Sequence, residues 1–125
     1  MTATIESRPS TLSGRIQRQH PTARVIRVIS LDVASDRDIA ALVSEIADVN
    51  MVVMVVPAGA DASAAAVIGK ACSDRRVMTT TVVVNAAAAS DEGLSATLAQ
   101  ARPWSLMVVV VDDRDYVDDI VRSFR

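Results

Sequence analysis

Hydrophobic residues gather in four short runs along the chain, and most of each run is continuous rather than alternating with polar positions. Short continuous runs rich in valine and isoleucine are typical of strands that are buried on both faces of a parallel sheet. The pattern therefore predicts four strands, at residues 25–29, 51–56, 77–84 and 106–111. Within them, Val53, Val83 and Val109 are expected to lie in the core.

A segment with the helical spacing of apolar residues follows each run. The apolar stripes are Ile39, Leu42, Val43 and Ile46; Ala64, Val67, Ile68, Ala71 and Cys72; Leu94, Leu98 and Ala101; and Val117, Ile120, Val121 and Phe124. Side chains suited to cap these helices precede the stripes, namely Ser35 with Asp38 as a capping box, Asp61 or Ser63, Ser90, and Asp112 or Asp113. Gly69 lies inside the second helix, where a missing side chain favours close packing on the sheet.

Strands that alternate with helices in this way form right-handed βαβ units. The predicted fold class is α/β, a small doubly wound three-layer sandwich of the flavodoxin or Rossmann type, with four mainly parallel strands in a (βα)×4 arrangement. The preferred strand order is 2-1-3-4, which makes residues 51–56 and 106–111 the edges of the sheet. Neither edge carries the lysine, the proline or the inward-facing charge that discourages edge pairing. A homo-oligomer or a bound partner protein is therefore expected.

Composition divides the chain into a flexible basic leader, residues 1–22, and a single α/β domain, residues 23–125. Residues 1–27 hold five arginines against one glutamate, whereas residues 28–125 hold eight basic and fourteen acidic residues. An acidic body repels phosphates, so nucleic acid is an improbable partner. No apolar stretch is long enough to span a membrane, and a single cysteine suits the cytoplasm. The excess of arginine over lysine and the abundant alanine resemble the composition of many bacterial proteins, and no function is inferred from them.

Polar residues follow the predicted strands, and in sheets of this kind ligands bind at the carboxyl ends of the strands, where the strand order reverses. In the 2-1-3-4 order the binding crevice would lie between the ends of the first and third strands. The candidate ligand-binding residues are Asp32, Ser35, Gly59, Asp61, Ser63, Asn85 and Ser90. A small anionic ligand could be held there by the free N–H groups of a helix N-terminus.

The stretch around Gly59 joins a predicted strand to a predicted helix, the place where a phosphate-binding loop occurs. Residues 51–84, about a quarter of the chain, resemble the nucleotide-binding half of the bacterial tubulin-like division GTPases in three features: a strand that ends in Ala58-Gly59, an alanine-rich helix and a Thr-Val-Val-Val strand. The glycine-rich phosphate loop of that family is missing, and so are the Walker and dinucleotide-binding motifs. Asp61 would also oppose a phosphate. A capping role for Asp61 and Ser63 is therefore favoured over nucleotide binding.

Few residues offer catalytic chemistry. The carboxylates of Asp32, Asp112 and Asp113 form a weak candidate for a metal site, since hard cations such as Mg²⁺ prefer oxygen ligands. The only histidine, His20, lies in the leader, and Cys72 falls on an apolar stripe that predicts a core position. No catalytic residue and no cofactor is assigned, and an enzyme is disfavoured without being excluded.

The sequence is therefore compatible with two functions. The favoured one is a non-catalytic α/β interaction or regulatory module, with room for a small anionic ligand at the strand ends. The alternative is a Mg²⁺-dependent enzyme, or enzyme subunit, that acts on a phosphorylated or nucleotide substrate through the strand-end carboxylates.

Overall fold

A computed structural model describes residues 24–124, so the leader predicted at residues 1–22, with its His20, lies outside the described residues. The strands are β1 (Ile26–Ser30), β2 (Met51–Pro57), β3 (Met78–Val84) and β4 (Met107–Val110). The α-helices are α1 (Asp36–Glu45), α2 (Ala64–Asp74), α3 (Asp91–Ala101) and α4 (Tyr116–Ser123), with short 3-10 helices η1 (Ile46–Asp48), η2 (Ala86–Ala88) and η3 (Arg102–Trp104). Strands and helices alternate as the hydrophobic pattern predicts.

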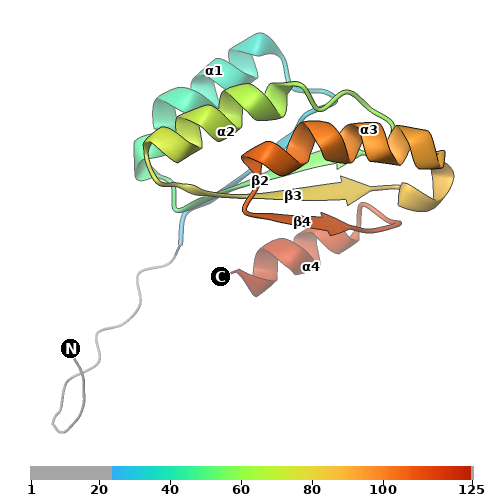
Figure 1. The fold of residues 1–125 in the computed structure, drawn as a ribbon. Coiled ribbons are helices and arrows are strands. Elements are labelled where there is room, and N and C mark those ends of the chain that lie inside the picture. The colour runs from blue at the N-terminus through green and yellow to red at the C-terminus, as the bar shows by residue number, and fades with distance from the viewer. Residues whose placement is uncertain (1–23, 125) are drawn as a thin grey trace, which may run out of the picture.

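The four strands form one parallel sheet in the order β1-β2-β3-β4. The α/β class and the three layers are confirmed, but the predicted 2-1-3-4 order is wrong. A 2-1-3-4 order needs the chain to reverse its direction across the sheet. Here each crossover moves one strand further in the same direction, and right-handed crossovers then place their helices on one face. Figure 1 shows α1, α2 and α3 on that face and α4 on the other.

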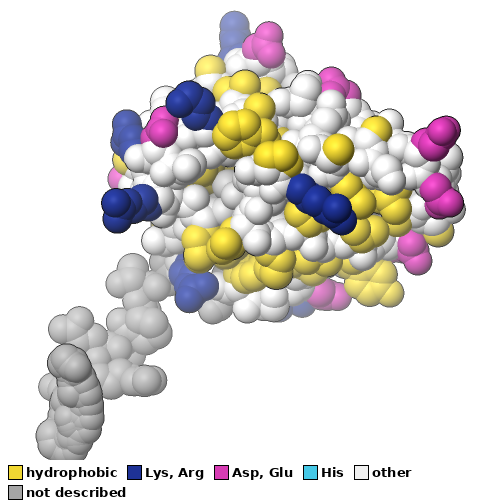
Figure 2. Space-filling model, viewed as in Figure 1, with side chains coloured by type: hydrophobic (Ala, Val, Ile, Leu, Met, Phe, Trp, Pro, Cys, Tyr) yellow, Lys and Arg dark blue, Asp and Glu magenta, His cyan; other side chains and the backbone are white. Residues whose placement is uncertain are grey.

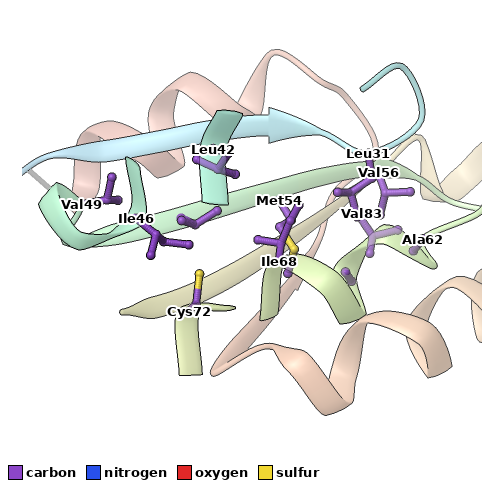
Figure 3. Close-up of a cluster of buried hydrophobic side chains, with 12 residues drawn as sticks. Leu31, Leu42, Ile46, Val49, Met54, Val56, Ala62, Ile68, Cys72 and Val83 are labelled. Carbon is purple, nitrogen blue, oxygen red and sulfur yellow. The ribbon is translucent and has the colours of Figure 1, made fainter. Parts of the chain in front are cut away.

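The larger core lies between the sheet and the three crossover helices. Its buried residues include Leu42 and Ile46 from the first crossover, Ile68 from α2, and Met54 and Val83 from the central strands (Figure 3). Cys72 is buried in the same cluster, which confirms its core position. Burial raises the pKa of its thiol to about 11, so the side chain stays protonated at neutral pH.

The opposite face of the sheet is covered by α4. Val117 and Val121 of this helix pack against Ile26 of β1 and Val53 of β2. The helix has aspartate and arginine on its outer side, and its single apolar stripe covers this face only in part, since Val28 of β1 beside it is 47% exposed. None of the helices in residues 24–124 is long and apolar enough to cross a membrane.

The strand order decides which strands are edges. Residues 51–56, expected at an edge, form the buried central strand β2, so that prediction is wrong. Residues 106–111 do contain an edge strand, and the second edge is β1. Val53 and Val83 are fully buried as predicted, but Val109 is only partly buried because β4 has a neighbour on one side only.

Candidate functional site

The sequential strand order removes the crevice that was expected between the ends of the first and third strands. A ligand-binding crevice forms where neighbouring crossovers leave the sheet on opposite faces. In this sheet β2 lies between β1 and β3, and the crossovers on both sides of it run over the same face. The loops after β1, β2 and β3 therefore turn to the same face. The connections part only between β3 and β4, because α4 lies on the opposite face, and there the Ala86 N–H donates to the carbonyl oxygen of Val111 over 3.2 Å.

The loop between β2 and α2 is held closed by α3. The Gly59 N–H donates to Thr97 Oγ1 over 2.9 Å, and the Ala62 N–H donates to Gln100 Oε1 over 2.7 Å. The hydroxyl of Thr97 lies within hydrogen-bond distance of the carbonyl oxygens of Ala60 and Gly93, at 3.0 and 3.1 Å. Two polar side chains of one helix thus supply hydrogen-bond partners to the backbone of a loop that lies nearly 40 residues earlier in the chain.

Asp61 completes this network from within the loop. Its carboxylate accepts hydrogen bonds from the backbone N–H and the hydroxyl of Ser63, both 3.0 Å long, and from Gln100 Nε2 at 3.1 Å. The Ser63 backbone and hydroxyl, followed by Gln100, lower the pKa of Asp61, so it carries its negative charge at neutral pH. The side chain braces the turn before α2, while Ser63 occupies the N-cap position without a side-chain cap bond.

These contacts bear directly on anion binding. A phosphate cradle needs backbone N–H groups that point outward without partners. Here the N–H groups of Ala58, Gly59, Ala60, Ala62 and Ser63 all donate within the protein. The glycine at position 59 is explained by its backbone, whose φ of +89° is in the region that favours glycine. The loop therefore has the geometry of a closed structural turn.

The other strand-end candidates also have structural contacts. Ser35 forms the predicted capping box with Asp38, and the hydroxyl of Ser90 caps α3 by accepting from the Gly93 N–H over 3.0 Å. Asn85, exposed at the end of β3, has a φ of +57°, a conformation that asparagine tolerates better than most residues. Asn85 and Ser90 share the connection between β3 and α3, where a Cβ built at Gly93 would lie 3.3 Å from the Cα of Gly59, whereas Ser35 lies in the connection between β1 and α1.

The strand-end carboxylates do not form a cluster. Asp32 is paired with Arg114 at 3.9 Å, and the same guanidinium donates to Ser30 Oγ over 3.3 Å. Asp113 accepts from the Asp115 N–H just before α4, whereas Asp112 is exposed. Within residues 24–124, no three histidine, cysteine, aspartate or glutamate side chains come close enough together to hold a metal ion. The structure thus does not bring Asp32, Asp112 and Asp113 together.

Apolar side chains are exposed instead along the edge strand β4. Leu106 is 74% exposed, Met107 41% and Val110 45%. In Figure 2 hydrophobic side chains follow the lower part of this face, where β4 lies, and acidic side chains gather at the right, beside the start of α3 and near the loop that follows β4. A surface pocket of about 420 Å³ adjoins the start of the strand and is lined by Leu106, Trp104 and Arg76, among others.

Sequence reasoning anticipated an exposed apolar edge at residues 106–111 but missed Thr97, Gln100 and Arg114. Thr97 and Gln100 are three residues apart and therefore share one face of α3. Two polar residues beside a weak apolar stripe were the available signal for their role. The ion pair of Arg114 could not be predicted from local sequence, because its partner Asp32 lies more than 80 residues away in the chain.

The chain matches no protein-family model, no curated protein and no solved structure at a significant level.

Replacing Thr97, whose side chain is buried, by valine is expected to destabilise the protein by about 2 kcal/mol, because the Gly59 N–H would lose its acceptor and the carbonyl oxygen of Ala60 would lose a donor. Denaturation by urea, followed by circular dichroism, measures this loss. Thr97→Ser is the matched control, since it keeps the hydroxyl and should lose less than half as much. A Thr97→Val protein as stable as the parent, beside a Thr97→Ser protein that is clearly less stable, would show that the methyl group, and not the hydroxyl, holds the loop.

Proposed function

We propose that this protein is a non-catalytic interaction module that binds a partner protein along the open edge of β4. The observation that carries the proposal is the exposed, uncharged apolar strand at this edge, formed by Leu106, Met107 and the following valines. Its backbone groups pair with β3 on one side only. An extended segment of a partner can add to such an edge through main-chain hydrogen bonds.

The contrast between the two edges of the sheet supports this proposal. At the other edge, β1 contains Arg27, whose guanidinium pairs with Glu45 of α1 at 3.2 Å. A charge within an edge strand discourages pairing with another chain, and the sequence Met-Val-Val-Val of β4 has none. An open strand of that composition promotes aggregation unless a specific partner covers it. A partner at β4 would therefore remove a hazard as well as provide a function.

The strand-end loops lend less support to a ligand site or an enzyme. The N–H groups that would bind an anion near Gly59 donate within the protein, and the carboxylate of Asp32 faces Arg114. The proposal therefore does not depend on a small ligand at the strand ends. A cytoplasmic location belongs to the same proposal, and the buried single thiol of Cys72 is compatible with a reducing compartment.

Photo-crosslinking in cells that express the protein tests the proposal. A benzophenone amino acid would replace Met107 in β4 in one variant and Val67 in a second variant. Val67 is a matched control, because it is an exposed apolar side chain (55%) that lies on α2, away from either edge. We expect one or two discrete adducts from position 107 and none of these from position 67. A chain that forms no adduct at position 107, or the same adducts from both positions, would refute binding along β4.

A further inference from the structure

We infer that the partner at the β4 edge is a second copy of this chain, paired antiparallel with the first. The twofold axis lies midway between the two copies of Val108, and we call this an axis through Val108. The inference rests on the proposed function and names its partner. It would join two four-stranded sheets into one continuous sheet of twice the width, with the crossover helices of both copies on the same face.

The pattern of exposed side chains selects this register. In an antiparallel pair related by a twofold axis perpendicular to the sheet, directly opposed residues must point to the same face. An axis through Val108 satisfies this condition and places Leu106 opposite Val110 of the other copy, and Met107 opposite Val109. Leu106 and Val110 are among the most exposed apolar side chains of the edge, and each would cover the other twice. An axis through Val109 would instead set Leu106 opposite Asp112, a poor match.

The charges at the two ends of β4 are also complementary under the same symmetry. Exposed basic residues lie at the start of the strand, Arg102 in η3 and Arg76 in the adjoining pocket. Exposed acidic residues, Asp112 and Asp113, follow its end. None of these four forms an ion pair with another residue of the described chain. Antiparallel pairing brings the basic end of each copy beside the acidic end of the other, and each such contact occurs twice.

The difference between the two edges explains why the assembly would stop at two copies. The twofold contact uses the β4 edge of both chains and leaves only the β1 edges at the outside of the joined sheet. Those edges carry Arg27, which discourages further addition of strands. An isologous contact of this kind is closed, whereas a contact between β4 and β1 would continue into a filament.

Sedimentation of the full chain gives the first test. We expect a concentration-dependent mass that approaches twice the monomer's 13.3 kDa at micromolar concentrations and falls as salt is raised. A mass that stays at 13.3 kDa over a hundredfold range of concentration would overturn the inference. The proposed function would then still be judged by the crosslink at position 107, since an adduct with a different protein supports binding at β4 without self-association.

Charge reversal tests the orientation of the two strands. Arg102→Asp and Asp112→Arg should each weaken dimerisation by at least about tenfold, because two ion pairs become two repulsive contacts. The double variant restores both pairs with the signs exchanged and should return close to the original affinity. Arg37→Asp, an equal change of charge on α1, is the control and should leave the affinity unchanged. A double variant as weak as the single ones would contradict the antiparallel arrangement.

Cysteine crosslinking tests the register. Residues on or beside the axis have Cα atoms about 4.5–5.5 Å apart across the pair, a distance that a disulfide can bridge. Val108→Cys should therefore crosslink to itself under mild oxidation, whereas Leu106→Cys should not. A mixture of Leu106→Cys and Val110→Cys chains should crosslink. Efficient self-crosslinking at position 106, or none at position 108 in a chain that sediments as a dimer, would overturn the proposed axis.

Discussion

Replacing Val53 by aspartate is expected to leave the protein unfolded, or close to unfolded, at neutral pH. Val53 lies in the middle of β2 with no exposed surface, between Val28 and Thr80 of the neighbouring strands and beneath α4. A carboxylate at this position would lose its hydration and find no cationic partner, which costs at least about 4 kcal/mol. That loss is comparable with the whole stability of a domain of this size, about 5–15 kcal/mol.

The measurement is thermal or urea denaturation followed by circular dichroism. Val67→Asp, the same substitution at an exposed valine of α2, serves as the control and should change stability by less than about 1 kcal/mol. A soluble Val53→Asp protein that melts within a few degrees of the parent would mean that β2 is not the central strand.

Replacing Gly69 by valine is expected to destabilise the protein by about 3 kcal/mol, although valine is the better helix former. Sequence reasoning expected this glycine to let α2 pack closely on the sheet, but the close neighbour is Trp104 of η3. A Cβ at position 69 would collide with the Cβ of Trp104 and crowd its ring. The tryptophan cannot withdraw easily, because its carbonyl oxygen accepts the hydroxyl of Thr79 over 2.7 Å.

A double variant separates this clash from a general effect on the helix. In a Trp104→Gly background both the Cβ and the ring are gone, so the added cost of Gly69→Val should fall by at least about 1 kcal/mol, a coupling typical of residues in contact. Lys70→Val, at the next position of the same helix, is the control for helix propensity and should be close to neutral. Strict additivity of the changes at positions 69 and 104 would contradict the contact.

Much of the fold could be predicted because the signals are local. The number of strands and helices follows from the hydrophobic periods, and the caps at Ser35 and Ser90 are visible in a few adjacent residues. The burial of Val53 and Cys72 follows from the same stripes. The role of the strand-end loops was harder to predict, because it depends on whether their backbone N–H groups already have acceptors within the protein. Gly59 looked available to a ligand until Thr97 and Gln100 were placed beside its loop.

Sequence by itself determined the α/β class, the alternation of elements and the apolar character of residues 106–111, since each depends on residues within one turn or one strand of each other. Only the tertiary structure decided the strand order, because right-handed crossovers of similar length can step to either side of a strand. That order turned residues 51–56 into a central strand, removed the crevice expected between the ends of the first and third strands, and left β4 at an edge. Arg102 and Asp112 flank residues 107–110 in the sequence itself, but only the strand order left that strand at an edge, where a twofold axis can match the two charges.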